Sequence, residues 1–359
     1  MGEQSKIEWC DHTASPWYGC TKISSGCTNC YAATLSKRNP GTLGIWGDDG
    51  TRVKSKSFIA NLRKWNRDAE RTGKVASVFP SMCDPFEDRP ELVEWRNEMF
   101  AVADELPWIR LLLLTKRPEN IRRMWPFKAD QEAAKEIAAN EGDAHPYYRP
   151  NVWLLTSIAN QSDAESYVLP LVCKSNFAPV YGLSIEPMLG PIDLTRIEKG
   201  GGETYNALTG EITTHRGHTF RCSDTEPIRW VIVGGESGHG ARPMHPDWAR
   251  SLRDQCVAAN VAFFFKQWGE WAPWMNEDHF THCGEEKHAH AWLDSATDKQ
   301  GLAWIVDDDG SWSNWTGDPP TDAGGQCLET VAVMGRVGKK AAGRLLDGRE
   351  WNETPNPGA

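Results

Sequence analysis

The run Ile109-Arg-Leu-Leu-Leu-Leu114 is almost continuously apolar and ends in Thr115-Lys-Arg-Pro118. Short apolar runs without alternation are typical of strands that are covered on both faces, as parallel strands are. The segment Lys6–Trp9 is expected to form one more short strand near the start of the chain. Five further runs share the apolar design and also end in polar or glycine residues: 75–79, 152–155, 180–185, 228–233 and 261–265.

Helical patterns lie between several of these runs. Apolar side chains step by three and four residues after Pro90, and further helices are expected to begin near Tyr31, Ser162 and His245. Alternating strands and helices predict an α/β fold with a parallel sheet. Seven strands favour a full or partial (β/α) TIM-like barrel, and an open doubly wound sheet is the alternative.

Two segments interrupt this alternation. Residues 195–227 contain Gly200-Gly-Gly202 and no core pattern, and we expect them to form an insertion, a β-hairpin on the rim of the barrel. From residue 268 the composition changes, so the predicted organisation is a barrel over 1–267 and a C-terminal extension over 268–359. The extension is expected to contain a hairpin at 303–310 and a basic tail.

Four chargeable side chains lie at the carboxyl ends of predicted strands: Lys116, Glu186, Glu236 and Lys266. In a parallel barrel this edge is the active-site face. We therefore predict catalytic roles for these four residues, and substrate contacts for Arg117 and Arg242. A substrate with an ammonium or an anionic group needs a fixed carboxylate or a fixed cation. The alternative is that these groups form rim salt bridges among themselves, which contribute little.

Three cysteines, Cys20, Cys27 and Cys30, fall within eleven residues of the loop that follows the first predicted strand. Three thiolates on a cubane iron–sulfur cluster leave one iron open, and three thiolates on zinc leave a similar vacancy. The spacing alone chooses neither, and unrelated thiols are a third interpretation. An open iron at the mouth of a barrel can hold S-adenosylmethionine (SAM), whose cleavage gives a 5′-deoxyadenosyl radical. The common radical-SAM motif, Cys-x3-Cys-x2-Cys, has a shorter first gap than this loop.

Together, several passages resemble a phage-associated family that is identified as divergent radical-SAM proteins, and the resemblance covers almost the whole chain. The passages are Pro16-Trp-Tyr-Gly-Cys20, Cys27-Thr-Asn-Cys-Tyr31, Leu114-Thr-Lys-Arg-Pro118, Leu183-Ser-Ile-Glu-Pro187, Val233-Gly-Gly-Glu-Ser-Gly238, Phe264-Phe-Lys-Gln-Trp-Gly269 and residues 338–348. The resemblance implies a radical-SAM barrel with a [4Fe–4S] cluster on the three cysteines. It also implies a role in the hypermodification of thymine in phage DNA. In one such step a glycine attached through nitrogen to the thymine methyl group is isomerised to a carbon-linked one.

The resemblance further implies partners and cofactor contacts. The partners are a modified DNA or nucleotide as substrate and an external electron donor of the flavodoxin or ferredoxin type. By position, Ser81 and Asp84 would meet the methionine amino group of SAM. Radical-SAM proteins usually carry Gly-Gly-Glu after the second strand, whereas here it follows the sixth, and a tight turn explains its glycines equally well. The remaining predicted cofactor contacts are Thr156, Ser157, Asn160, Gly234 and Gly235.

The formal net charge of −10 argues against coating nucleic acid through bulk charge, although the tail at 338–349 is locally basic and is expected to contact phosphates. The start of the chain lacks a signal-peptide pattern and no stretch matches a membrane span, so we expect a cytoplasmic protein without membrane contact, in the host cytoplasm if a phage encodes it. Histidines and cysteines at 279–290, with His215, His218 and Cys222, are candidates for a second metal site. A zinc-binding nucleic-acid module without radical chemistry is the alternative function.

Overall fold

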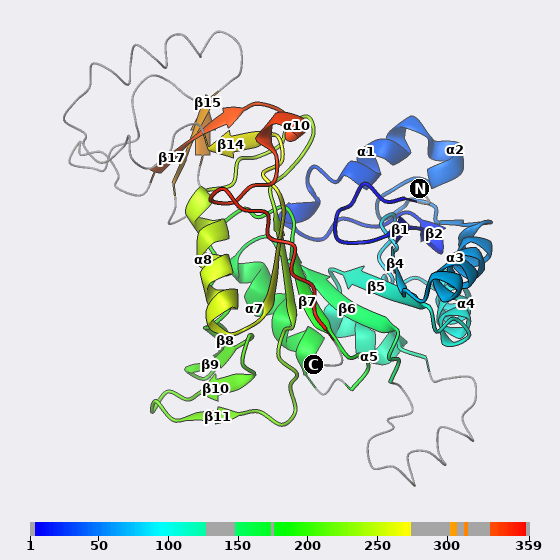
Figure 1. Ribbon diagram of the computed structural model, residues 1–359, viewed down its shortest axis with the longest axis horizontal. Coiled ribbons are helices and arrows are strands. Elements are labelled where there is room, and N and C mark those ends of the chain that lie inside the picture. The colour runs from blue at the N-terminus through cyan, green and yellow to red at the C-terminus, as the bar shows by residue number, and fades with distance from the viewer. Residues whose placement is uncertain are drawn as a thin grey trace, which may run out of the picture.

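The computed structural model describes residues 4–126, 148–173, 176–273, 302–306, 312–314 and 331–356. Its centre is a seven-stranded parallel sheet with the order β1-β4-β5-β6-β7-β12-β13 (Figure 1). Strand order follows chain order throughout, so the sheet winds in one direction and does not reverse as a doubly wound sheet does. The predicted partial barrel is confirmed. The strands are β1 His12–Thr13, β4 Ala76–Phe79, β5 Ile109–Thr115, β6 Val152–Ser157, β7 Tyr181–Ile185, β12 Trp230–Gly234 and β13 Ala262–Gln267.

Helices follow or connect most of these strands (Figure 1). The helices expected near Tyr31, after Pro90, near Ser162 and near His245 are all present. None of the helices in the described ranges is long and apolar enough to cross a membrane. The helices are α1 Tyr31–Arg38, α2 Pro40–Leu43, α3 Phe58–Thr72, α4 Leu92–Asp104, α5 Ile121–Met124, α7 Gln161–Val172, α8 Pro246–Ala258 and α10 Lys339–Ala342, with 3₁₀ turns η1 Ser25–Cys27 and η2 Pro118–Asn120.

The two faces of the sheet have different coverings. Along each strand, successive side chains point to opposite faces and join two different hydrophobic clusters. The larger cluster includes residues of the helices, and the smaller one includes no helical residue. In β6, for example, Leu154 faces the helices, whereas Trp153 and Leu155 face the other way. The second face is the concave interior of the partial barrel, and it is lined by aromatic rings.

The predicted strand Lys6–Trp9 is wrong. These residues form turns, and the first strand of the sheet is His12–Thr13. Trp9 instead packs inside the partial barrel, with its ring centroid 4.6 Å from that of Phe79 and 6.0 Å from that of Trp230. Exposed Lys6 and Glu8 alternate with partly buried Ile7 and buried Trp9, as in a strand, but such a pattern does not show whether the backbone is paired.

The insertion at 195–227 forms a four-stranded antiparallel sheet instead of a single hairpin, and its predicted place on the rim is wrong. The amide of Glu226 donates to the carbonyl of Val172 at the end of α7. The backbones of Cys173 and Thr225 form an isolated antiparallel β-bridge. Because α7 starts after the carboxyl end of β6, its own end lies at the opposite side of the barrel (Figure 1). The strands are β8 Ile197–Gly200, β9 Glu203–Asn206, β10 Glu211–Thr213 and β11 Thr219–Arg221.

The chain beyond β13 forms a second antiparallel sheet in the order β14-β17-β15-β16, and the predicted hairpin is its β15–β16 pair. The tail then returns along β13. There the amide of Phe265 donates to the carbonyl of Trp351, and the backbones of Phe264 and Asn352 form an isolated antiparallel β-bridge. The division at residue 267 stays a prediction. The strands are β14 Trp271–Pro273, β15 Leu302–Val306, β16 Trp312–Asn314 and β17 Val331–Arg336, and a separate pair is β2 Trp17–Tyr18 with β3 Val53–Lys54.

Helix α4 offers a matched test of the packing. Leu92 is fully buried, whereas the next residue, Val93, is 50% exposed. We expect Leu92→Ala to lower the free energy of unfolding by about 2–5 kcal/mol, because it removes buried methyl groups and leaves a cavity. Val93→Ala should change it by no more than about 0.5 kcal/mol. Urea denaturation of both variants measures the difference, and equal effects would contradict this packing.

Candidate active site: the cysteine loop at the carboxyl rim

The three clustered cysteines lie on the loop between β2 and α1, which we call the cysteine loop (residues 20–30). Just before it, the amide of Gly19 donates to the carbonyl of Met82 at 3.1 Å. The backbone of Gly19 also forms an isolated parallel β-bridge with that of Cys83. Both Met82 and Cys83 follow the carboxyl end of β4. Cys27 ends the 3₁₀ turn η1, and Cys30 immediately precedes α1. The loop therefore lies at the rim where sequence reasoning placed it.

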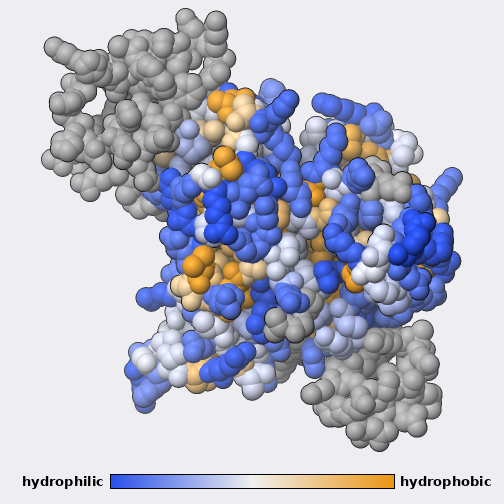
Figure 2. Space-filling view, in the orientation of Figure 1, coloured by the Kyte–Doolittle hydropathy of each residue, from blue (hydrophilic) through white to orange (hydrophobic). Residues whose placement is uncertain are grey.

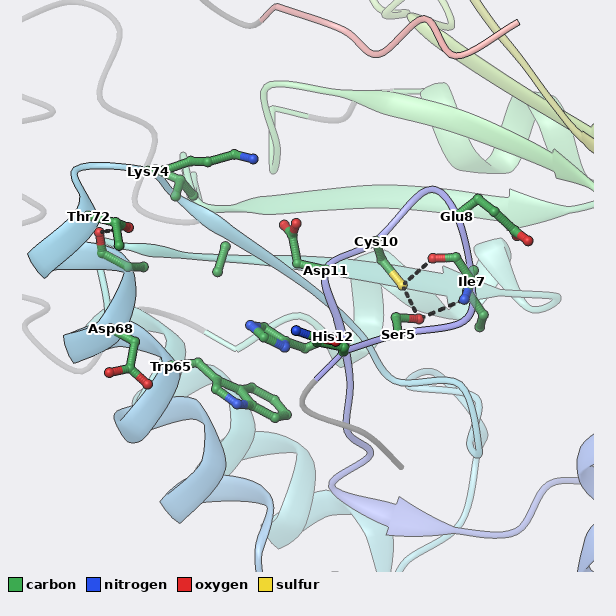
Figure 3. Close-up of a pocket in the computed structure, with 14 residues that line it drawn as sticks. Ser5, Ile7, Glu8, Cys10, Asp11, His12, Trp65, Asp68, Thr72 and Lys74 are labelled. Carbon is green, nitrogen blue, oxygen red and sulfur yellow. Dashed lines mark hydrogen bonds between the residues drawn. The ribbon is translucent and has the colours of Figure 1, made fainter. Parts of the chain in front are cut away.

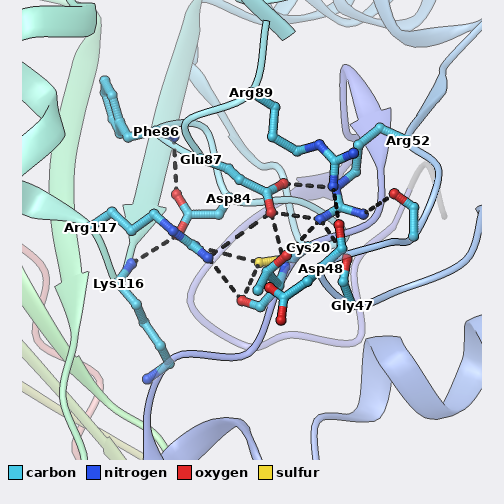
Figure 4. Close-up of polar contacts among 12 residues, drawn as sticks. Cys20, Gly47, Asp48, Arg52, Asp84, Phe86, Glu87, Arg89, Lys116 and Arg117 are labelled. Carbon is cyan, nitrogen blue, oxygen red and sulfur yellow. Dashed lines mark hydrogen bonds and ion pairs between the residues drawn. The ribbon is translucent and has the colours of Figure 1, made fainter. Parts of the chain in front are cut away.

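Arg117 fixes the start of the loop (Figure 4). Its guanidinium donates to Asp84 Oδ2 at 2.7 Å, to the carbonyl of Thr21 at 2.9 Å and to Cys20 Sγ at 3.6 Å. Asp84 also accepts from the hydroxyl of Thr115 and the amide of Lys116, so β5 holds its carboxylate in place. The ends of β4 and β5 together position Cys20.

A second buried ion pair supports the first. Arg52 donates to both carboxylate oxygens of Glu87, at 2.8 and 2.6 Å, and Glu87 accepts from the amide of Thr21 at 3.0 Å. Arg52 also donates to the carbonyl of Gly47 and to the hydroxyl of Thr21. Figure 4 shows Arg52, Glu87, Asp84 and Arg117 around Cys20. Sequence reasoning missed Arg52 and Glu87, because neither directly follows an apolar run of the main sheet.

Glu236 and Arg242 hold the other half of the loop. The carboxylate of Glu236 accepts from Arg242 Nη2 at 2.7 Å, from Arg242 Nε at 2.9 Å and from Asn29 Nδ2 at 3.0 Å. Arg242 also donates to the carbonyl of Ser25 at 3.2 Å. With its hydrogen bonds used in this way, Glu236 positions the loop. Its catalytic role stays a prediction.

Lys116 lies beside the middle of the loop. Its ammonium donates to Ser157 Oγ at 2.8 Å and to the carbonyl of Ser157 at 3.3 Å. A Cβ atom on Gly26 would lie 3.2 Å from Lys116 Nζ, so the backbone of the loop passes close to this charge. Burial lowers the pKa of Lys116, and the nearby thiol of Cys27 opposes that effect.

The environments of the three thiols differ. Burial raises the pKa of Cys20 and of Cys30, against the opposing effects of Arg117 on Cys20 and of the Ala32 and Ala33 amides on Cys30. At Cys27 burial also acts to raise the pKa, but backbone hydrogen bonds and Lys116 outweigh it, so its pKa lies below the ordinary value. Each sulfur thus has a cation or backbone amides beside it.

These surroundings fit a thiolate-bound cluster, because positive groups and amides stabilise the negative charge of thiolates. Within the part of the chain that the structure describes, no three ligand-type side chains lie close enough to share a single metal ion. A cubane cluster does not require such convergence, since each thiolate binds a different iron. Cys20, Cys27 and Cys30 all have intermediate exposure and lie on this one loop.

Glu186 and Lys266 form a separate pair at the ends of β7 and β13. Lys266 Nζ lies 2.8 Å from Glu186 Oε1, and Ser184 Oγ donates to Glu186 at 3.1 Å. Burial alone would lower the pKa of Lys266, but Glu186 outweighs it and the pKa is raised. Both side chains keep some exposure, 16% and 14%. Among the described residues, neither side chain of this pair has a hydrogen bond or an ion pair with the cysteine loop.

The predicted cofactor contacts occupy mixed positions. The carbonyl of Ser81 accepts from the hydroxyl of Tyr31, and Ser157 accepts from Lys116. The buried hydroxyl of Thr156 donates to the carbonyl of Thr115, and Asn160 caps the start of α7 by accepting from Asp163. Asp84, as above, is paired with Arg117. These five are therefore held by protein contacts, and their roles toward SAM stay predictions.

The two glycines after β12 are explained by close backbone packing. A Cβ on Gly235 would lie 1.9 Å from the carbonyl oxygen of Trp268, and one on Gly234 would lie 2.9 Å from Glu186 Oε1. No real Cβ is tolerated at 1.9 Å from a backbone oxygen, so glycine is required at position 235 for packing alone. A cofactor role for either glycine stays a prediction.

The candidates for a second metal do not come together in the described residues. His215 and His218 are exposed on the insertion, at the opposite side of the barrel from the cysteine loop. The segment 279–290 lies outside the residues that the structure describes.

A 450 Å³ pocket lies beside the amino ends of β1 and β4, away from the rim (Figure 3). Its lining residues include Cys10, His12, Trp65 and Asp68.

Comparisons with known proteins give one family and one distant structure. The family described as "Protein of unknown function (DUF5131)" matches residues 4–355. Among curated proteins nothing matches. A solved mutant of spore photoproduct lyase, with bound AdoMet and dinucleoside spore photoproduct, is similar at 12% identity with a TM-score of 0.33. The similarity covers 50% of this chain and 46% of that chain, and at this TM-score it carries no argument about fold or activity.

The Glu236–Arg242 pair predicts a pH dependence. Burial acts to raise the pKa of Glu236, but hydrogen bonds from Arg242 and Asn29 outweigh it and hold the pKa below the ordinary value of 4.5. A depressed pKa stabilises the folded state above the unfolded pKa, and the contribution is lost as the pH falls through the folded pKa. Between pH 6 and pH 3, Glu236→Gln should therefore lose less unfolding free energy than the wild type.

Urea denaturation at the two pH values measures this difference. Glu198→Gln is the matched control, because Glu198 is exposed on β8. Between the two pH values, Glu198→Gln should lose as much unfolding free energy as the wild type does. An equal loss in Glu236→Gln would show that the ion pair does not contribute as the geometry indicates.

Proposed function

We propose that this chain, which belongs to the DUF5131 family, is a radical-SAM enzyme that holds a [4Fe–4S] cluster on Cys20, Cys27 and Cys30. One observation carries the proposal: ion pairs fix a loop with three cysteines at the carboxyl rim of a partial parallel barrel. Active sites of parallel barrels lie at this rim. A cluster bound by three cysteines has one open iron, which supplies SAM binding and an electron for SAM cleavage.

The residues around the loop would prepare it for such a group. Lys116 and backbone amides lower the pKa of Cys27, which favours its thiolate form, and Arg117 partly offsets the effect of burial at Cys20. The anchors on both halves of the loop reduce the conformational entropy that cysteines would lose when they bind. The apolar interior below the rim, including Trp153 and Trp230, keeps water away from a reactive centre.

For the substrate we propose an amino-acid-decorated thymine in DNA or as a nucleotide, with glycinyl-thymine isomerised from a nitrogen link to a carbon link. This step rests on the resemblance to the phage-associated family. The Glu186–Lys266 pair supports it, because a carboxylate and an ammonium at the rim match the ammonium and carboxylate of an amino acid. The reducing electron would come from a flavodoxin- or ferredoxin-type donor.

Anaerobic purification with iron, sulfide and zinc analysis tests the cofactor. We expect about four irons per chain and formation of 5′-deoxyadenosine after addition of dithionite and SAM. Cys20→Ala, Cys27→Ala and Cys30→Ala should each lose both properties. Cys222→Ala, on the distant insertion, should retain them. A colourless protein with one zinc per chain would overturn the proposal and favour a zinc-binding nucleic-acid module.

A double variant, Glu186→Gln with Lys266→Met, tests the substrate pair without leaving a buried charge unpaired. We expect iron content and SAM cleavage without substrate to stay at the wild-type level, since neither residue contacts the cysteine loop. Conversion of glycinyl-thymine should be lost. Undiminished conversion would remove the pair from the proposed substrate site.

A further inference from the structure

We propose that the rim beside the cysteine loop binds a single nucleic-acid strand, with Lys339 and Lys340 on its phosphates and Tyr31 stacked on a base. The inference deepens the proposed function, because it names the surface that would present a base to the barrel. It depends on two exposed features, an aromatic ring and a basic cluster, that the rest of the site does not use.

The aromatic feature is on α1, directly after Cys30. Tyr31 is 56% exposed, and Leu35, one turn further along the same face, is 41% exposed. Arg38 lies on that face as well, at the end of the helix, and is exposed. The hydroxyl of Tyr31 donates to the carbonyl of Ser81 at 3.0 Å, which fixes the ring. A fixed, exposed ring is a stacking platform, since every base has an aromatic face.

The basic feature is at the end of β17 and in α10. Lys339 and Lys340 are exposed, and neither ammonium group has a hydrogen bond or an ion pair with a described residue. Arg336 donates to the carbonyl of Gly238 at 3.3 Å. Phosphate contacts from such side chains dominate the affinity of proteins for nucleic acid, even in a protein whose net charge is negative.

A short loop joins these two features. Gly238 contacts Arg336, and two residues later the carbonyl of Gly240 accepts from Asn29 of the cysteine loop at 2.8 Å. The basic cluster thus begins one loop away from the cysteines and from Tyr31. Figure 1 shows α10 and α1 on either side of this region, and Figure 2 shows hydrophilic surface over both with a hollow between them.

The acidic groups of the neighbouring tail are already paired, so they do not neutralise the lysines. Glu350 pairs with Arg344, Glu353 with Arg349, and Asp347 with Arg250 and Arg253. Glu270 lies near Gly338, at the start of α10, and accepts from the amide of Gly238, which leaves one acid beside two lysines. The positive charge at Lys339 and Lys340 therefore remains available to a polyanion.

A nucleic-acid strand matches this surface better than an acidic polypeptide does. A strand carries phosphates at regular intervals and flat bases beside them, which suits a basic cluster next to an exposed ring. An acidic polypeptide supplies the charge without an aromatic face. The distinction gives the test, because an abasic strand keeps the phosphates and removes the bases.

The test uses fluorescence anisotropy of the full-length protein with a twelve-nucleotide oligothymidylate and with an abasic strand of equal length. Wild-type protein should bind oligothymidylate more tightly. Tyr31→Ala should weaken that binding roughly 5- to 150-fold and leave abasic binding unchanged. Tyr31→Phe should retain most of that binding, because it keeps the ring and loses only the hydroxyl contact with Ser81.

A charge-neutral variant, Lys339→Gln with Lys340→Gln, should weaken binding of both strands. The slope of log affinity against log salt concentration should fall by about 1.4, because two phosphate contacts to a single strand are removed. Lys74→Gln with Arg221→Gln removes the same charge from exposed positions away from the rim and should not change binding.

Two results would overturn the inference: equal affinity of the wild type for polyglutamate and oligothymidylate, or unchanged binding in both the tyrosine and the lysine variants. Iron content and SAM cleavage are measured on the same preparations. Lost strand binding with intact SAM cleavage overturns only this inference. An absent cluster with intact, base-dependent strand binding overturns the proposed enzyme and retains the nucleic-acid surface.

Discussion

Two ion pairs, Arg117–Asp84 and Arg242–Glu236, hold the cysteine loop against the sheet, and the site depends on both. One connects the start of the loop to the ends of β4 and β5, and the other connects its end to the segment after β12. Buried ion pairs add little net stability, because desolvation offsets their attraction. Their value here is positional, since a long loop with few apolar residues has little core packing to keep one geometry.

The pairs also separate the charged residues of the rim into two groups. Glu236 and Arg242 form hydrogen bonds with each other and with the cysteine loop. Glu186 and Lys266 contact each other at the neighbouring strand ends. A charge at the end of a parallel strand therefore does not by itself indicate catalysis. Its hydrogen-bond partners decide whether it supports the scaffold or faces a substrate.

The sequence predicted the sheet well and the loop contacts poorly. Six of the seven strands were correct because their apolar runs have no other stable placement, but Trp9 was misplaced because buried loops and buried strands share the same composition. Helix α3 was missed although Phe58, Leu62, Trp65 and Ala69 repeat at helical spacing. Arg52 and Glu87 could not be found, since they are far apart in sequence and meet only in the folded chain.

The sequence by itself determined the parallel α/β fold, the rim as the place of the polar residues, and the three cysteines on one loop. These follow from local patterns, because apolar periodicity and residue spacing act over a few positions. The tertiary structure alone decided that Arg117, Arg52 and Glu236 fix that loop, and that the insertion lies at the other side of the barrel. It also decided that the segment 238–240 contacts both Arg336 and Asn29. Such contacts join segments that are distant in the chain, and their geometry exists only after the sheet has formed.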